Sequence, residues 1–204
     1  MSNCQLYLIS PLEVGGDFPD RLARALDAGP VAAFQFRVKG IDEHEAARLA
    51  APLQAICAER EVAFIVNDSI SLAKRLGADG VHLGQDDGTV EEARQRLGRE
   101  AQIGVTCHDS RHLAMEAGEA GADYVAFGAF FPTTTKEVKH QAGPDLLEWW
   151  QAIMEIPCVA IGGITPENCA PLVAAGADFI AVSGAVWNCD EAAAVRAFAK
   201  ILAD

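Results

Sequence analysis

Eight short apolar runs alternate with eight segments of helical periodicity, and this alternation constrains the fold more than any other feature of the chain. Most of the apolar runs are continuous, as expected of parallel strands that are covered on both faces. Eight strand–helix units predict an α/β fold, a single (β/α)8 TIM barrel over residues 1–204. The expected strands are Gln5–Ser10, Ala32–Val38, Ala63–Val66, Gly80–Gly84, Gln102–Cys107, Tyr124–Phe131, Cys158–Ile164 and Phe179–Ser183.

The helical segments each place apolar residues on one face, and several end at a glycine. Pro52 is expected to kink or split the second helix, and Asp109 is expected to cap the fifth. A doubly wound open sheet is the alternative fold, but residues 10–16 lack its usual glycine-rich turn. The expected helices are Phe18–Ala28, Ile41–Arg60, Ser69–Leu76, Val90–Leu97, Arg111–Ala120, Pro144–Met154, Pro166–Ala175 and Asp190–Leu202.

The tripeptide Gly-Ala-Asp recurs before the fourth, sixth and eighth expected strands, at residues 77–79, 121–123 and 176–178. A glycine at the end of a helix followed by a tight turn explains this repeat. We therefore assign it a structural role and no chemistry.

Charge and cysteine usage exclude several classes of protein. The net charge of −13 disfavours nucleic acid as a partner, because phosphates would be repelled. The six cysteines are scattered without a Cys-x-x-Cys pair, as in reduced cytoplasmic proteins. We expect no secretory signal and no membrane span, because no basic segment precedes an apolar core and no apolar run reaches about 18 residues.

A polar segment follows the sixth expected strand directly. Pro132 ends the strand because it has no N–H to donate, and Thr133, Thr134, Thr135 and Lys136 come next. Hydroxyls, backbone N–H groups and an ammonium at a strand end make an anion cradle. An ordinary solvated loop is the alternative.

The second expected strand carries two cations on one face. Side chains alternate along a strand, so Gln35, Arg37 and Lys39 share the face that points into the barrel or its mouth. Two cations there need anions, and in so acidic a protein this predicts a bound phosphate or diphosphate. An internal salt bridge to barrel carboxylates is the alternative.

Carboxylates end the next two strands. Asp68 follows Asn67, and Asp87 follows the fourth strand, so both carboxylates can reach a Mg²⁺ that also binds phosphate oxygens. Helix capping is the alternative for each aspartate. Thr106, at the end of the fifth strand, is a candidate hydrogen-bond donor to a ligand. His108 and His112 are spaced for a metal pair, but no third ligand has suitable spacing, which favours surface histidines.

Small residues follow the last two strands. Gly162-Gly163 and Ser183-Gly184 are typical of the phosphate site that many barrels form there from backbone N–H groups. The chain thus has two predicted anion sites, one beside cations and carboxylates. The simplest interpretation is that two phosphorylated substrates are joined in one pocket.

Over nearly its whole length the chain resembles thiamine phosphate synthases. The resemblance implies a transferase that joins a hydroxymethylpyrimidine diphosphate to a thiazole phosphate in thiamine biosynthesis and releases pyrophosphate. It also implies that the C–O bond ionises first and that the thiazole nitrogen traps the cation. The motifs that carry it are Gln35–Lys39, Asn67-Asp68, Gly80–Asp87, Phe131–Lys136 and Ala160–Ile164.

The resemblance also implies roles for single residues. Gln35, Arg37, Lys39 and Asn67 bind the pyrimidine diphosphate, Asp68 and Asp87 hold Mg²⁺, and Lys136 contacts the diphosphate; Arg37, Lys39 and Lys136 stabilise its departing charge. Thr133 and Thr135 contact the thiazole phosphate, as do Gly163, Ser183 and Gly184, and Thr106 stands where the family usually has Ser. The other departures are Val38 for Glu, Thr134 for Pro, and Ser183-Gly184 at the usual Val-Ser.

Three other functions stay open at this point. A thiazole tautomerase would bind thiazole phosphate without coupling it, and would not need the cations and carboxylates. A catalytically silent sensor would bind the same ligand without turnover. A sugar-phosphate epimerase would need a facing acid–base pair. The sequence does not predict an oligomeric state.

Overall fold

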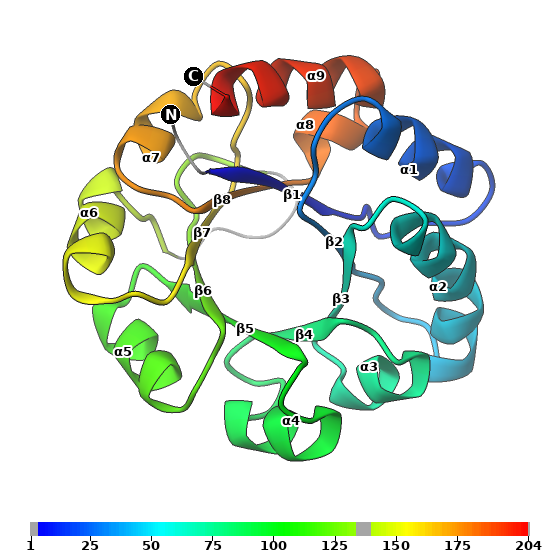
Figure 1. The fold of residues 1–204 in the computed structure, drawn as a ribbon, viewed down its shortest axis with the longest axis horizontal. Coiled ribbons are helices and arrows are strands. Elements are labelled where there is room, and N and C mark those ends of the chain that lie inside the picture. Colours follow the sequence, from blue (N-terminus) through cyan, green and yellow to red (C-terminus); the bar gives the residue numbers. More distant parts are fainter. Residues whose placement is uncertain (1–3, 134–139, 204) are drawn as a thin grey trace.

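The computed structural model describes residues 4–133 and 140–203, and these form a closed barrel of eight parallel strands (Figure 1). Each strand pairs with the next, and β8 pairs with β1. The predicted TIM barrel is confirmed. The strands are β1 (Gln5–Ile9), β2 (Ala33–Phe36), β3 (Ala63–Asn67), β4 (Gly80–Leu83), β5 (Gln102–His108), β6 (Tyr124–Phe127), β7 (Cys158–Ile161) and β8 (Phe179–Val182).

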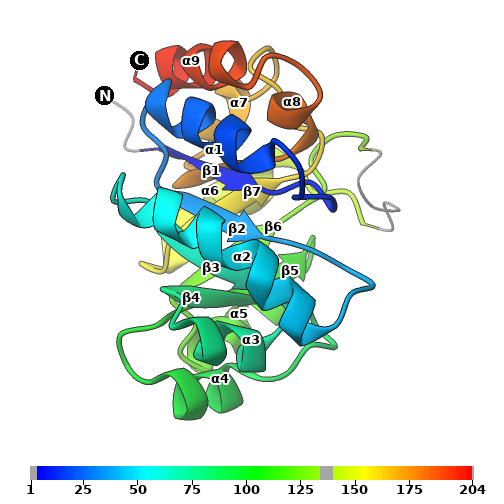
Figure 2. The same ribbon diagram turned by 90° about the vertical axis from the view of Figure 1, so that its right-hand side faces the viewer.

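Helices form an outer ring around these strands (Figure 1). In Figure 2 the loop between β2 and α2 extends to the right, which marks the end of the barrel where the strands finish. The helices are α1 (Phe18–Asp27), α2 (Glu43–Ala58), α3 (Ile70–Leu76), α4 (Val90–Leu97), α5 (Arg111–Glu119), α6 (Pro144–Ile153), α7 (Ala170–Ala174), α8 (Gly184–Trp187) and α9 (Glu191–Leu202).

Several predicted boundaries are wrong. The helix expected from Pro166 begins only at Ala170, because the Thr165 N–H donates to Asn168 Oδ1 in a preceding turn. Pro52 does not split α2, which is one helix in the structure. Asp109 does not cap α5, since Ser110 Oγ accepts the Leu113 N–H instead. The short helix α8 was not predicted.

Strands β6 and β7 are each shorter than expected. β6 ends at Phe127 and β7 ends at Ile161, where Gly162 takes a φ of +102° that no strand residue adopts. Beyond these ends the two segments still pack together, because the Phe130 N–H donates to the Ile161 carbonyl. The apolar composition of both segments therefore reflects burial rather than strand structure.

Alternating side chains divide the core into two parts. On β2, Phe34 and Phe36 pack outward against the helices, whereas Gln35 points into the barrel, as predicted. On β1, Tyr7 and Ile9 belong to a small interior cluster of barrel residues. The interior is therefore packed, and the polar groups inside it lie close under the mouth.

The repeated Gly-Ala-Asp is structural, as predicted, and its aspartates add a second function. Each glycine has a positive φ that ends a helix, and each aspartate accepts a backbone N–H from the neighbouring strand. The three bonds are Asp79 to Phe64 at 2.7 Å, Asp123 to Ile103 at 2.7 Å and Asp178 to Cys158 at 2.8 Å. The repeat thus caps β3, β5 and β7 at the end of the barrel where the strands begin.

Replacing Asp178 by alanine should lower the free energy of unfolding by about 1–3 kcal/mol, because the Cys158 N–H would be left buried without an acceptor. Gln151 would lose the same partner. Urea unfolding of the variant measures this. Glu155→Ala, at an exposed position nearby, is the control and should unfold like the parent protein; equal stability of both variants would contradict the capping role.

Candidate active site

The predicted site residues of the first half of the chain gather at the ends of β2 to β5. Gln35, Arg37 and Lys39 come from β2 and the residues after it, Asn67 and Asp68 from the end of β3. The side chain of Gln35 reaches Tyr7 on β1, and that of Lys39 reaches Asp68 after β3. Of the threonine-rich segment, Thr134, Thr135 and Lys136 lie outside the described residues, whereas Thr133 lies within them.

Arg37 is held at the mouth by its backbone. The Ser10 hydroxyl accepts the Arg37 N–H at 2.9 Å and donates to the Arg37 carbonyl at 3.1 Å, so the end of β1 fixes the end of β2. The guanidinium Nη1 is sealed from solvent, and no described residue accepts a hydrogen bond from it. A buried cationic nitrogen without a partner is costly, which indicates a place for an anionic ligand.

Lys39, Asp68 and Asp87 form a charged cluster at the mouth of the barrel. Lys39 Nζ lies 3.2 Å from Asp68 Oδ2, so Lys39 makes a salt bridge, which was the alternative to ligand binding, but at the half-exposed mouth and not inside the barrel. Asp68 has a left-handed φ of +66°, an uncommon conformation that directs its side chain here. Neither aspartate caps a helix: Ser69 caps α3, and Asp87 accepts the Gly84 N–H at 2.9 Å.

The two carboxylates of this cluster lie close enough to affect one another. Partial burial of its carboxyl group raises the pKa of Asp87, and the neighbouring Asp68 raises it further. The Gly84 N–H and Lys39 act in the opposite direction. A carboxylate whose ionisation is opposed by a second carboxylate beside it is part of a suitable donor set for a divalent cation that keeps water or phosphate as its other ligands.

Below the mouth, five polar side chains form a continuous row of hydrogen bonds, which we call the inner chain. Its members are buried or half-buried and come from five different strands. The links are Gln35 Nε2 to Tyr7 Oη at 3.0 Å, Tyr7 Oη to Tyr124 Oη at 3.0 Å, Tyr124 Oη to His82 Nδ1 at 3.1 Å, and His82 Nε2 to Thr106 Oγ1 at 2.8 Å.

Sequence reasoning missed Tyr7, Tyr124 and His82 as members of this site. Burial raises the pKa of Tyr7 to about 12 and that of Tyr124 well above its ordinary value. Both phenols are therefore neutral donors and acceptors near pH 7. The sequence signal that could have found these residues is a polar side chain within a predicted strand, on the face that points into the barrel.

The glycines after β7 are required by close packing. Gly163 has a φ of +64°, and a Cβ there would overlap the carbonyl oxygens of Phe131 and Pro132. Asn168 Nδ2 holds this turn by donating to the Gly163 carbonyl at 3.1 Å. The predicted site residue Gly163 thus joins the loops that follow β6 and β7.

The end of β8 is held in place by the unpredicted helix α8, which lies beside α9 at the end of the barrel where the strands finish (Figure 2). Trp187 Nε1 donates to the Ile9 carbonyl at 2.6 Å, and Arg21 Nη2 donates to the Trp187 carbonyl at 2.6 Å. Ser183 Oγ lies 3.4 Å from the Ser10 carbonyl, with which it forms a long hydrogen bond. Ser183 and Gly184 are therefore held beside the strand end that also fixes Arg37.

The structure does not bring His108 and His112 together as a metal pair. His108 stacks on His140 with ring centroids 4.7 Å apart, whereas His112 lies 3.4 Å from Glu116. Within residues 4–133 and 140–203, no three His, Cys, Asp or Glu side chains cluster as a metal site. In the same part of the chain, no helix is both long and apolar enough to cross a membrane.

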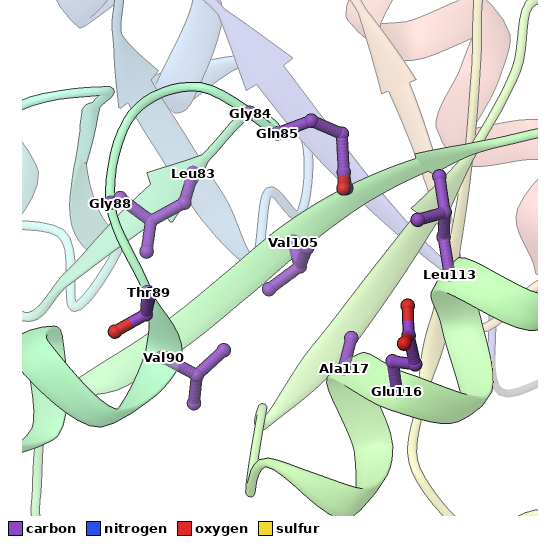
Figure 3. A pocket seen from close by; sticks show the side chains of 10 residues that line it. All are labelled: Leu83, Gly84, Gln85, Gly88, Thr89, Val90, Val105, Leu113, Glu116 and Ala117. Carbon is purple, nitrogen blue, oxygen red and sulfur yellow. The ribbon is translucent and has the colours of Figure 1, made fainter.

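A separate cavity of about 240 Å³ lies outside the barrel wall (Figure 3). Leu83 and Val105 face it from β4 and β5, and α4 and α5 supply Val90, Leu113 and Glu116. Because Leu83 and Val105 point away from the barrel interior, this cavity does not communicate with Gln35 or the inner chain. It does not hold the predicted site.

Comparison with known proteins gives consistent matches. A family model described as thiamine monophosphate synthase matches residues 6–186. A thiamine-phosphate synthase of Erythrobacter litoralis is 74% identical, over 98% of this chain and 95% of that protein. One of Rhodospirillum centenum is 55% identical over 99% of each. A solved thiamine phosphate pyrophosphorylase of Pyrococcus furiosus has a TM-score of 0.87 and 30% identity, covering 99% of this chain and 96% of that one.

Proposed function

This chain belongs to the thiamine monophosphate synthase family, and we propose that the mouth of its barrel is where the family's reaction takes place. The protein is a thiamine-phosphate synthase. It is a transferase that condenses 4-amino-2-methyl-5-(diphosphooxymethyl)pyrimidine with hydroxyethylthiazole phosphate and releases pyrophosphate. We also infer that residues 1–204 are one catalytic domain, and we place it in the cytoplasm because none of the six cysteines, all of which lie within the described residues, forms a disulfide.

The sealed Nη1 of Arg37 is the observation that carries this site assignment. A diphosphate oxygen at this nitrogen would supply the acceptor that the described residues do not. Lys39 lies two residues further along and can share the same anion, with Asn67 on the adjacent strand. The pyrimidine diphosphate therefore binds across the ends of β2 and β3.

Asp68 and Asp87 fit a Mg²⁺ ion and would hold it next to this diphosphate. Mg²⁺ commonly takes one or two carboxylates and completes its octahedron with water and phosphate oxygens. The raised pKa of Asp87, to which the neighbouring Asp68 contributes, fits a divalent cation beside the two carboxylates. Bound there, the ion would supply Lewis-acid stabilisation of the leaving diphosphate.

The thiazole phosphate is placed on the other side of the mouth. Gly163, Ser183 and Gly184 would bind its phosphate through backbone N–H groups, and Thr133 and Thr135 would contact the same substrate. Thr106 would donate to the bound substrates from β5. Lys136, which follows β6 in the sequence and lies outside the described residues, would contact the diphosphate.

The residues of the mouth favour ionisation without a covalent enzyme intermediate. The C–O bond to the methylene carbon breaks, its electron pair leaves with pyrophosphate, and the thiazole nitrogen then forms the C–N bond. Arg37, Lys39 and Lys136 stabilise the charge that develops on the leaving group. A thiol nucleophile is disfavoured, since burial raises the pKa of Cys107, the cysteine after Thr106, to about 12.

A coupling assay tests this function directly. Pyrophosphate release should require both phosphorylated substrates and added Mg²⁺, and each substrate alone is the control. Release that needs both would agree with the condensation. If thiazole phosphate raised the melting temperature but no release occurred, the chain would instead be a tautomerase or a silent binding protein, readings that the cations and carboxylates of the mouth disfavour.

A further inference from the structure

The inner chain is built into the barrel rather than formed by chance contact. His82 and Tyr124 belong to β4 and β6, which are separated by β5. Gly104 of β5 is paired in register with His82 on one side and with Tyr124 on the other. A Cβ at Gly104 would overlap the Tyr124 ring. The missing side chain lets the two rings stack at 5.6 Å and form their hydrogen bond across β5.

The links of the inner chain fix one another's direction. A tyrosine hydroxyl has one hydrogen to donate. Because the Tyr7 oxygen accepts from Gln35 Nε2, its own hydrogen goes to Tyr124, its other partner among the described residues. The Tyr124 hydrogen then goes to His82 Nδ1, so the His82 hydrogen stands on Nε2 and points to Thr106. Reversing any one link would require the others to reverse.

The free end of the inner chain is the side-chain amide oxygen of Gln35, Oε1. No described residue donates a hydrogen bond to it, and it is not sealed from solvent, unlike Arg37 Nη1. Arg37 follows Gln35 by two residues along the extended backbone at the end of β2, so it lies on the same face and about 7 Å closer to the mouth. A ring joined by one methylene to a diphosphate on Arg37 therefore reaches Gln35.

We propose that the inner chain fixes the direction of the Gln35 amide, so that Gln35 accepts the substrate's 4-amino group and rejects a 4-oxo ring. This inference rests on the proposed function. Tyr7 and Tyr124 are then positioning residues, since they act on the substrate only through Gln35. An oxo group in place of the amine would put two acceptors face to face, and the Gln35 amide could turn only if the whole inner chain reversed.

Tyr124→Phe is the sharpest variant for testing this role. The phenyl ring keeps its packing and the Gln35–Tyr7 contact, but the Tyr7 hydrogen loses its acceptor and can turn to the Gln35 oxygen instead. Tyr7 can then form a hydrogen bond with the Gln35 side-chain amide in either of its two orientations. We expect the ratio of kcat/KM for the 4-amino and 4-oxo pyrimidine diphosphates to fall about 10-fold, with the KM for thiazole phosphate unchanged. Tyr7→Phe, which removes the Gln35 contact itself, should reduce the ratio at least as far.

A purely structural role predicts a different result. Both pyrimidines would then lose kcat/KM by the same factor, and an unchanged ratio would overturn the proposal. If the parent protein coupled neither pyrimidine, the proposed function would fail instead, and the inner chain would still be open to a spectroscopic test.

That second test uses the unmodified protein. Nitrogen NMR of ¹⁵N-histidine-labelled protein reports which ring nitrogen carries the hydrogen, and a His82→Gln variant identifies the signals of this residue among the five histidines. Hydrogen on Nε2, with Nδ1 as acceptor, agrees with the proposed direction. Hydrogen on Nδ1 reverses the inner chain and overturns the proposal, whatever the kinetics show.

Discussion

Asp87→Asn is expected to lower Mg²⁺-dependent turnover by about 10²–10⁴-fold while the barrel stays folded. Asparagine keeps an oxygen that can accept the Gly84 N–H, so the turn survives, but the charge that we propose holds the cation together with Asp68 is lost. Pyrophosphate release at several Mg²⁺ concentrations measures this. Asp86→Asn changes the neighbouring exposed carboxylate and is the matched control, which should keep near-normal turnover.

The same substitution should also raise the stability of the metal-free protein, because the pKa of Asp87 is raised in the folded state. In the metal-free protein the folded state holds a proton on this carboxyl at pH values above its ordinary pKa of 3.8, so stability falls as the pH rises from there through the raised pKa. The asparagine side chain cannot ionise, and the metal-free variant should melt slightly higher than the parent at neutral pH. Mg²⁺ should stabilise the parent alone, and its binding should weaken as the pH falls through the raised pKa. A variant that both melts lower and still responds to Mg²⁺ would contradict the assignment.

Much of the architecture could be predicted because it depends on local patterns. Continuous apolar runs give parallel strands, and the alternation on β2 correctly placed Gln35 inward and Phe34 outward. The repeated Gly-Ala-Asp was correctly assigned to turns. Element ends were less predictable, because Phe131 and Ile164 are apolar through burial of loops that pack together, and not through strand pairing.

The interior of the site could not be predicted, because it depends on contacts between distant strands. Tyr7 and Tyr124 lie 117 residues apart, and no local pattern indicates that their hydroxyls meet. The role of Gly104 is likewise visible only when its neighbours on β4 and β6 are known. Helix α8 was missed because four residues are too few to show a helical period.

Arg37→Met is expected to lower kcat/KM for the pyrimidine diphosphate by about 10²–10³-fold without lowering stability. Methionine keeps much of the aliphatic stem and removes a buried nitrogen that no described residue satisfies, so the metal-free variant should unfold at the same or a higher urea concentration than the parent. The KM for thiazole phosphate should change little, because we propose that its phosphate binds after β7 and β8, on the other side of the mouth.

Two controls separate the geometry of Arg37 from its charge. Arg37→Lys keeps the charge but not the planar fork, and should fall between the parent and the methionine variant. Arg99→Met removes an exposed arginine elsewhere and should behave like the parent. A methionine variant that turned over normally would show that the unpartnered nitrogen serves no anion; one that lost stability in proportion to activity would show that Arg37 stabilises the fold instead. Loss of turnover with stability intact is the result that a ligand-binding cation requires, because its partner is then the substrate and not the protein.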